Sequence, residues 1–429
     1  MQNLYFAGAN TFMETMTEAA LSDRRQIGFK ETVALVAMLM ALNALAIDSM
    51  LPALPAIGEA LGVGDANQRQ WVVTSYLLGF GAAQIIYGPL SDRYGRRPVL
   101  FLGVGIYVLF SFVAALAWSF ETLLFARFAQ GVGSACCRVL AVAIVRDCYG
   151  GRRMAQVMSL AFLVFLGVPV IAPSLGALIV LVAPWHWIFV LLGVWGAVIL
   201  AWAALRLPET LHPENRLPID MRRIGKAFSE TVTTRASIGY ALAMTVIMGC
   251  LFGFINSAQQ VFADVFHAEA LFPIIFAAVA SGIAVASLLN ARLVERLGMR
   301  LLSHLALIGF TVVSAIHLAV AATGHENLIT FAVLQTLTMF CFGFLGGNFG
   351  AMAMEPLGHI AGTASSAQGL ISAIGGALIG FFIGQHFDGT TVPLTLGFTL
   401  CGLAAIAIVF WTEGGRLFTA KHLPPAEAG

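Results

Sequence analysis

The chain has 429 residues, of which 59% are hydrophobic and only 10% are charged. A water-soluble protein carries about a quarter charged residues, so the composition excludes a soluble enzyme, a nucleic-acid-binding protein and a disordered scaffold. The 23 Lys and Arg residues nearly match the 22 Asp and Glu residues, so the net charge indicates neither an acidic nor a basic partner. The six cysteines lie in or at the ends of apolar runs without paired spacing, and we expect them to be reduced and to bind no metal.

The chain begins with a segment, residues 1–30, that we expect to be a cytoplasmic tail. No cleavable signal is predicted, because the first apolar run starts only after Glu31 and is long enough to cross a bilayer. Asn3–Phe6 resembles part of a viral-protease cleavage tag. The segment is therefore expected to take no part in the fold.

Twelve apolar runs follow, each about twenty residues long, which is the length of a bilayer-spanning helix. In chain order the predicted spans are Thr32–Leu51, Trp71–Leu90, Val99–Trp118, Leu123–Val145, Val157–Val182, Trp187–Leu205, Ile238–Phe262, Leu271–Leu289, Leu302–Ala322, Leu328–Ala351, Ala364–Gly384 and Pro393–Trp411. We expect residues 31–207 and 237–412 to form two six-helix bundles, joined by a charged cytoplasmic linker at 208–236 and followed by a cytoplasmic tail at 413–429. The sequence therefore predicts an all-α polytopic membrane protein.

The positive charges indicate the orientation, because loops on the cytoplasmic side retain Lys and Arg. With the first residues inside, 20 of the 23 Lys and Arg residues fall in cytoplasmic segments, and only Arg69 falls in an outer loop. The other two, Arg127 and Arg138, lie within the fourth predicted helix. We therefore expect a multi-pass protein of the cell inner (plasma) membrane with both termini in the cytoplasm.

An internal repeat relates the two predicted bundles. The loop Gly88–Arg97 joins the second and third helices, and a shift of 203 residues places it on Ala291–Arg300, between the eighth and ninth. Leu, an acidic residue, Arg, Gly and Arg recur in register in the two loops. Two pseudo-symmetric halves of this kind are the architecture of transporters whose substrate site lies between the halves.

The segment Gly88–Leu100 resembles the cytoplasmic signature of the major facilitator superfamily at every fixed position. A charged turn in any membrane protein shows part of this pattern, but its repetition favours the signature, and the resemblance covers essentially the whole chain after residue 30. It implies the major facilitator fold and a loop that holds neighbouring helices in one conformational state. The predicted gating residues are Gly88, Asp92, Arg93, Gly95, Arg96 and Arg97. Asp92→Asn is expected to change the balance of conformations more than substrate affinity.

Three further stretches resemble the twelve-helix drug:proton antiporters, most closely the bicyclomycin-resistance (Bcr/CflA) group. They are Ala46–Pro55 at the end of the first helix, Arg127–Gly133 with Val145–Asp147 on the fourth, and Leu207–Thr210 after the sixth. The antiporter signature of the fifth helix is partial, because Ala172-Pro173 stands where the wider family has Gly-Pro. Its candidate residues are Pro169, Pro173 and Gly176. The resemblance implies proton antiport, with symport as the alternative.

Ionisable side chains within the predicted spans are few. Asp48 is the only acidic residue there, and Arg127 and Arg138 are the only Lys or Arg residues. Such groups are costly in lipid and face a cavity or a partner. By the helical rise, Asp48 and Arg127 both fall in the outer third of a core about 30 Å thick, so they are expected to meet. We assign proton coupling to this pair; the alternative is a static ion pair that ties the first and fourth helices together.

A polar stripe runs along the fourth predicted helix, where Arg127, Gln130, Ser134 and Arg138 share one face. We expect this face to line a central cavity, with Gln130, Ser134 and Arg138 binding substrate; the alternative for Arg138 is an interfacial base that reaches the headgroups. The other predicted substrate contacts are Asn43, for which a helix-packing hydrogen bond is the alternative, Asn256 and Gln335. Within the predicted spans the one carboxylate, Asp48, is outnumbered by two bases, Arg127 and Arg138. The pocket is therefore expected to prefer neutral, zwitterionic or anionic compounds over permanent cations.

Together these features predict a monomeric secondary transporter that exports small amphipathic compounds in exchange for protons, by rocking its two halves about a central cavity. The expected partners are the small-molecule substrate and the lipid bilayer. The proton is the expected coupling ion, without a cofactor, a metal site or nucleic acid. The alternatives are a proton-coupled carrier of a specific metabolite and a non-transporting membrane sensor. An enzyme is disfavoured because the nine His residues are scattered and no nucleophile–base cluster lies in a loop.

Overall fold

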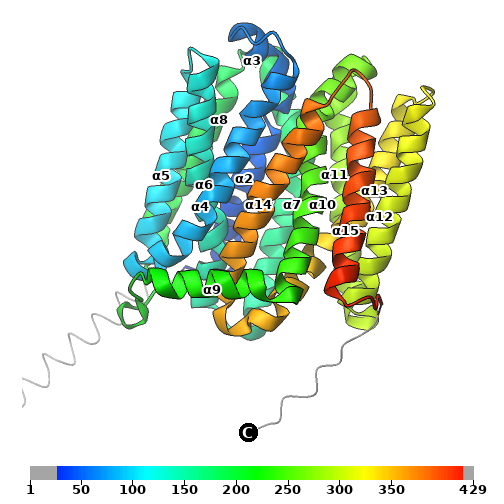
Figure 1. The fold of residues 1–429 in the computed structure, drawn as a ribbon. Helices are drawn as coiled ribbons and strands as arrows, with labels where there is room; N and C mark the ends of the chain where they lie inside the picture. Colours follow the sequence, from blue (N-terminus) through cyan, green and yellow to red (C-terminus); the bar gives the residue numbers. More distant parts are fainter. Residues whose placement is uncertain (1–26, 419–429) are drawn as a thin grey trace, which may run out of the picture.

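The structure, a computed structural model, describes residues 27–418, without the side chains of residues 151, 152, 155 and 223, so most of each predicted tail lies outside the described residues. Between these residues the chain forms helices, turns and short connections, with no strand. Twelve helices of 20 residues or more run side by side (Figure 1). They are α2 (Phe29–Asp48), α4 (Trp71–Tyr94), α5 (Arg96–Ala115), α6 (Phe120–Cys148), α7 (Gly151–Val182), α8 (His186–Arg206), α10 (Arg235–Gln260), α11 (Phe272–Leu297), α12 (Met299–Ala322), α13 (Leu328–Met354), α14 (Ala361–Gln385) and α15 (Val392–Thr412). The predicted order of helices is confirmed.

Proline and glycine set several helix ends. The helix α2 ends at Asp48, shortly before its predicted end, because Pro52 and Pro55 lack the backbone N–H groups that would continue it. The chain goes on as a 3₁₀ turn and a short helix, α3 (Leu54–Ala60). Between α4 and α5 the chain turns at Gly95, whose φ of 102° is open to glycine at little cost. The signature loop predicted from the sequence is therefore a one-residue turn between two helices.

The long helices form two bundles with the same internal packing. In the first, α4 and α5 pack on α6, α2 packs on α7, and α5 packs on α8. In the second, α11 and α12 pack on α13, α10 packs on α14, and α12 packs on α15. Across the bundles α4 packs on α14, and α7 packs on α11. Each contact in one bundle thus has its equivalent six long helices later, as a duplicated architecture requires.

A helix of the linker, α9 (Met221–Thr233), lies across one end of the molecule (Figure 1). It packs on α10 and α14, burying Ala227 and Thr231. We call this end of the bundle the linker end, and the opposite end, where α3 lies, the far end. The described chain both begins and finishes at the linker end.

Large apolar side chains cover much of the outer surface. Leu181 is 82% exposed and Ile329 is 76% exposed, an arrangement that suits lipid and is unfavourable in water. Eleven helical segments of the described chain are long and apolar enough to cross a membrane, with α13 and α14 counted together because the 3₁₀ turn Glu355–Ile360 joins them. Helices satisfy their own backbone hydrogen bonds, which a bilayer requires. The prediction of an all-α polytopic membrane protein is confirmed.

Candidate functional site

A cavity of about 850 Å³ lies between the two bundles. The first bundle lines it with α2, α4, α6 and α7, and the second with α10, α11, α13 and α14. Much of its wall is aromatic rings and methionine side chains, among them Phe80, Phe165, Phe252, Phe276, Met244 and Met248. Its size and apolar wall are those of a site for a small amphipathic molecule.

Two charged side chains line this cavity among the described residues, Asp48 and Arg138. Asp48 is the last residue of α2 and is 4% exposed. Arg138 lies on α6, and its exposed side chain faces the cavity. Neither side chain makes a hydrogen bond or an ion pair with the side chains or backbone that the structure describes. The cavity therefore holds one acid and one base whose charges no described side chain of the protein neutralises.

The expected contact between Asp48 and Arg127 does not form. The Arg127 guanidinium is 0% exposed and donates instead to the carbonyl oxygens of Ala46 and Val72, each at 3.1 Å, and to Gln130 Oε1 at 2.6 Å. The partners come from α2, the start of α4 and α6 itself, so the neutral acceptors already surround the guanidinium. Arg127 thus connects three helices by hydrogen bonds. It forms neither a proton-coupling pair nor a static ion pair with Asp48.

The polar stripe of α6 lines the cavity only at Arg138, which corrects the expectation for the rest of it. Gln130 donates to Ser111 Oγ at 2.7 Å, and Ser134 accepts from Tyr76 Oη at 2.7 Å, both inside the first bundle. The stripe keeps one direction along the helix, but what lies in that direction changes. Near the far end α2, α4 and α5 of the same bundle cover it, and one turn or more nearer the linker end Arg138 faces the cavity.

The predicted contacts outside α6 divide into one that lines the cavity and two that do not. Asn43 lines it, while its side-chain oxygen accepts from Tyr76 Oη at 2.8 Å. Asn256 and Gln335 are 1% and 0% exposed within the second bundle and are not among the lining residues. In this conformation neither side chain reaches the cavity, because the faces that carry them pack inside their own bundle.

Neutral polar residues of the second bundle also line the cavity and were missed in the sequence, among them Ser287, Asn290 and Gln368. Asn290 exchanges two hydrogen bonds with Asn348, at 2.8 and 3.1 Å. Gln368 donates to Ser237 Oγ at 2.9 Å. Asn290 lies one residue beyond the predicted end of its helix, and α11 extends further, to Leu297. An uncharged side chain within a span also carries little signal by itself.

The fifth long helix, α7, brings its predicted antiporter residues to the end of α2. Pro169 lines the cavity, and Pro173 lies within the helix one turn further on. A Cβ on Gly176 would lie 1.7 Å from the carbonyl oxygen of Ser49, the residue after Asp48. Only glycine permits this approach, and it places α7 directly against the chain that carries Asp48.

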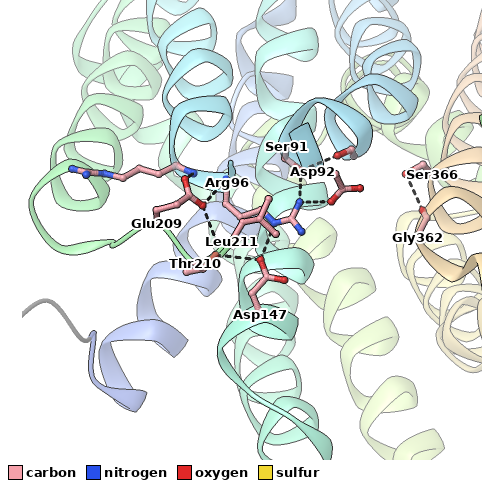
Figure 2. A network of polar contacts seen from close by, with 11 residues as sticks. Ser91, Asp92, Arg96, Asp147, Glu209, Thr210, Leu211, Gly362 and Ser366 are labelled. Carbon is pink, nitrogen blue, oxygen red and sulfur yellow. Dashed lines mark hydrogen bonds and ion pairs between the residues drawn. The ribbon is translucent and has the colours of Figure 1, made fainter. Parts of the chain in front are cut away.

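At the linker end the turn between α4 and α5 holds a network of polar contacts (Figure 2). The Arg96 guanidinium contacts Asp92 at 2.6 Å, and Asp147 near the end of α6 at 2.8 Å. The backbone N–H groups of Arg96 and Arg97 donate to the Glu209 carboxylate at 2.8 and 3.2 Å. This network joins the turn, α6 and the segment after α8.

The other predicted gating residues lie in or beside this network. The Arg97 side chain donates to the carbonyl oxygen of Ala204 at 2.6 Å, and Arg93 is exposed. Gly88 lies within α4, where a Cβ would be 3.5 Å from Ser366 Oγ of α14. The hydrogen bonds of the network itself all join parts of the first bundle and the linker. The network therefore holds neighbouring helices of the first bundle and does not connect the two bundles in this conformation.

The second bundle repeats the network in a reduced form. Arg300, near the turn between α11 and α12, contacts Glu355 at 3.1 Å and Glu413 at 3.0 Å. Glu355 follows α13 and Glu413 follows α15. In the first network, Asp147 lies at the end of α6 and Glu209 follows α8. Gly298 in the turn has a φ of 80°. Both turns therefore bind acids with an arginine, Arg96 in the first bundle and Arg300 in the second, where Met299 stands at the position of Arg96.

We expect Gly95→Ala to lower the stability of the protein. An alanine at φ 102° is strained, and its Cβ would lie 2.4 Å from Glu209 Oε2, displacing the carboxylate from the two N–H groups that it accepts from. The expected cost is about 1–3 kcal/mol, seen as a lower apparent melting temperature of the detergent-solubilised protein. Gly105→Ala on α5, where no atom lies within 4 Å of the added Cβ, is the control and should melt no lower than the wild type. If Gly95→Ala has the same apparent melting temperature as the wild type, the turn at Gly95 does not stabilise the protein as the geometry indicates.

At the far end four amide side chains connect the bundles, and we call them the amide clamp: Asn67, Gln70, Gln260 and Gln385. Gln70 donates to Gln260 Oε1 at 2.6 Å, and Gln260 donates to Asn67 Oδ1 at 2.7 Å. Gln385 donates to the carbonyl oxygen of Asn67 at 2.7 Å. The first two belong to the turn before α4, and the others end α10 and α14. Neutral amides at helix ends give no signal in a single sequence, and the clamp was not predicted.

Comparison with known proteins gives the family. Residues 36–380 match the sequence profile of the Major Facilitator Superfamily. YdgK of Bacillus subtilis, an uncharacterised MFS-type transporter, is 32% identical over 363 residues, which cover 84% of this chain and 90% of that protein. A bicyclomycin resistance protein homolog of Haemophilus influenzae is 27% identical over 372 residues, covering 86% and 93%. The crystal structure of a D-xylose–proton symporter has a TM-score of 0.72 at 14% identity, over 91% of this chain and 98% of that one.

These findings confirm the family expected from Gly88–Leu100 and the resemblance to drug antiporters expected from Ala46–Pro55. The profile spans both bundles and both copies of the repeated loop. The solved structure, at its low identity, supports the fold alone. Because the family consists of transporters, the expectation that the chain is not an enzyme is also confirmed. The chain belongs to the major facilitator superfamily, as a multi-pass membrane transporter.

Proposed function

We propose that the protein is a proton-coupled exporter of small amphipathic compounds, in which Asp48 carries the proton. The observation that supports this most is Asp48 itself, an acid 4% exposed that lines the cavity without a partner among the described residues. A carboxylate placed in this way costs free energy while it is charged, unless a proton or a ligand neutralises it. A group that can exchange a proton on each side in turn can couple transport to a proton gradient.

The conformation supports alternating access. The excess of Lys and Arg assigns the linker end, and with it both termini, to the cytoplasm. The cavity reaches that end, since Met354 at the end of α13 and Ser365 near the start of α14 line it. At the far end the amide clamp holds the bundles together. We infer an inward-facing state, with the outer gate closed.

The cycle follows from these contacts. A compound enters the cavity from the cytoplasm as Asp48 releases its proton inward, and the bundles then rock so that the far end opens. Asp48 binds a proton from outside as the compound leaves. The close contact of Gly176 with Ser49 links the state of this acid to α7, a helix that two internal prolines allow to bend.

The apolar wall of the cavity favours amphipathic compounds over a polar metabolite. A dedicated metabolite site would hydrogen-bond most polar atoms of its ligand, whereas here Ser287, Asn290 and Gln368 already form hydrogen bonds within the protein. The name of the H. influenzae relative, a bicyclomycin resistance protein homolog, agrees with drug export. We further propose that the transporter acts as a monomer in the inner membrane, with the proton as coupling ion and no bound cofactor.

Reconstituted proteoliposomes test the proposal. With a proton gradient imposed, a panel of neutral and acidic antibiotics, bicyclomycin included, should be moved uphill by the protein while protons flow the opposite way. Collapsing the gradient with a protonophore should remove the uphill component within the same assay. Accumulation that is indifferent to the gradient would refute proton coupling, and proton flow in the same direction as the compound would show symport.

The amide clamp should hold the outer gate closed. Replacing Gln70 with alanine removes its hydrogen bonds to Gln260 and to the carbonyl oxygen of Gly384, so we expect a larger outward-open population. The populations can be measured as distances between spin labels on cysteines introduced at Glu59 on α3 and at His325 in the loop between α12 and α13, both exposed. The protein for this measurement lacks its six native cysteines.

The control for this measurement is Gln68→Ala, two residues away on the same turn, where the side chain is exposed and makes no hydrogen bond with the described residues. It should leave the distance distribution unchanged. If Gln70→Ala also leaves it unchanged, the clamp does not set the conformational equilibrium.

A further inference from the structure

We propose that the cavity recognises compounds with a single anionic head group, and that Arg138 is the residue that binds this head. The inference rests on the proposed function for the direction of transport, but the binding site that it names does not depend on proton coupling. It narrows the expected substrates to amphiphiles that carry one carboxylate, sulfonate or phenolate group beside an apolar body.

The first step is that Arg138 has no partner while comparable arginines do. Arg127 donates to three neutral acceptors, Arg96 contacts two carboxylates, and Arg300 contacts two more. Arg138 faces the cavity and makes no hydrogen bond, ion pair or ring contact within the described part of the protein. Its five N–H donors are therefore available to a ligand.

The second step is that the nearest acids are either engaged or distant. Asp147 lies nine residues further along α6 and is held by Arg96 at 2.8 Å and by Thr210 at 3.3 Å. Asp48 lies close to the level of Arg127, because Arg127 donates to Ala46. Arg138 is eleven residues, or about 16 Å by the helical rise, nearer the linker end. No ion pair with either acid can form across those separations.

The third step concerns the surroundings of Arg138. The polar residues across the cavity are neutral, and Asn290 and Gln368 already form hydrogen bonds within the second bundle. Aromatic rings and methionines make up much of the remaining wall and can contact the apolar body of a ligand. A planar guanidinium binds a carboxylate in a two-point contact. The same positive field disfavours a permanent cation.

The charges of the transport cycle give this inference a second consequence. If one organic anion leaves for each proton that enters, two elementary charges cross the membrane in the direction that an inside-negative potential favours. A neutral compound exchanged for one proton moves one charge, and a monovalent cation moves none. Export of anions should therefore respond to the membrane potential more steeply than export of their neutral analogues.

Binding to the purified full-length protein in nanodiscs tests the site directly, with three probes that share one ring system: 1-naphthylacetate, 1-naphthylacetamide and 1-naphthylmethyltrimethylammonium. We expect the carboxylate to bind at least tenfold more tightly than the amide, and the quaternary ammonium most weakly. Arg138→Gln should remove the tenfold preference while leaving the affinity for the amide unchanged. Arg138→Lys should restore part of it, because the charge remains but the two-point contact is lost.

The matched control is Arg146→Gln, the same substitution on the same helix at an exposed arginine that does not line the cavity; it should bind all three probes as the wild type does. Equal affinity of the carboxylate for the wild type and Arg138→Gln, or tighter binding of the ammonium probe, would overturn the inference. Asp48→Asn should keep the preference for the carboxylate, so a failure of proton coupling would not be mistaken for a failure of this site.

In proteoliposomes without a pH gradient, an imposed inside-negative potential should drive export of the carboxylate more strongly than that of the amide; an equal response would contradict the charge count.

Discussion

Asp48→Asn should abolish uphill, proton-driven export while leaving the protein folded and able to bind its ligands. The carboxylate is the one acidic side chain among the described residues that line the cavity, so no neighbour can take over its proton. We expect uphill accumulation in proteoliposomes under a proton gradient to fall at least tenfold. Downhill movement of a preloaded compound should persist, because an amide resembles the protonated acid in shape and charge.

The same variant should not be less stable than the wild type. Asp48 makes no hydrogen bond or ion pair with residues 27–418, and a buried charge without a partner costs free energy that the neutral amide does not. The apparent melting temperature should therefore stay the same or rise.

Glu59→Gln is the control for this experiment, since it makes the same change of acid to amide at an exposed position of α3. It should transport as the wild type does. Undiminished uphill export by Asp48→Asn would show that another group carries the proton, and a loss of folded protein in that variant would show that Asp48 has a structural partner.

Arg127→Gln should produce the largest loss of stability among the substitutions considered for α6. The guanidinium is 0% exposed and ties α2, the start of α4 and Gln130 through three hydrogen bonds, and it lies 4.4 Å from the centre of the Tyr76 ring. Each hydrogen bond from a charged group contributes about 1.5–3 kcal/mol, and its acceptor is left buried when the donor is lost. We expect a loss of roughly 3 kcal/mol or more on that basis, with a marked fall in the apparent melting temperature.

Two comparisons separate this structural role from a role of the charge alone. Arg127→Lys keeps the charge, but one ammonium group cannot reach all three acceptors, so it should also melt below the wild type. Arg138→Gln changes the same residue type on the same helix where the guanidinium has no partner among the described residues, and it should melt at or above the wild-type temperature. If Arg127→Gln and Arg138→Gln melt alike, the three hydrogen bonds do not stabilise the first bundle as the geometry indicates.

The sequence by itself determined the membrane class, the number and order of the long helices, and the duplication. These depend on local quantities: the length of each apolar run, the side of the chain on which Lys and Arg lie, and the recurrence of Gly88–Arg97 as Ala291–Arg300. It also singled out Asp48 and Arg138, because a charge inside an apolar run is conspicuous wherever the helix is placed. The helix ends near Pro52 and Gly95 differ from the predicted ones by several residues, because capping and turn geometry set them.

Only the tertiary structure decided which of these side chains meet. Helical periodicity put Arg127, Gln130, Ser134 and Arg138 on one face, but it could not show that α2 and α4 cover this face near the far end and that it is open to the cavity further along. Helical periodicity likewise placed Asp48 and Arg127 at similar depths in the membrane, but it could not show whether the two side chains point toward each other. In the structure the Arg127 guanidinium donates to neutral backbone carbonyls and forms no ion pair with Asp48. The amide clamp was invisible to the sequence for a related reason. Its members are uncharged and more than 300 residues separate Asn67 from Gln385, so their hydrogen bonds exist only because the two bundles pack with their far ends together.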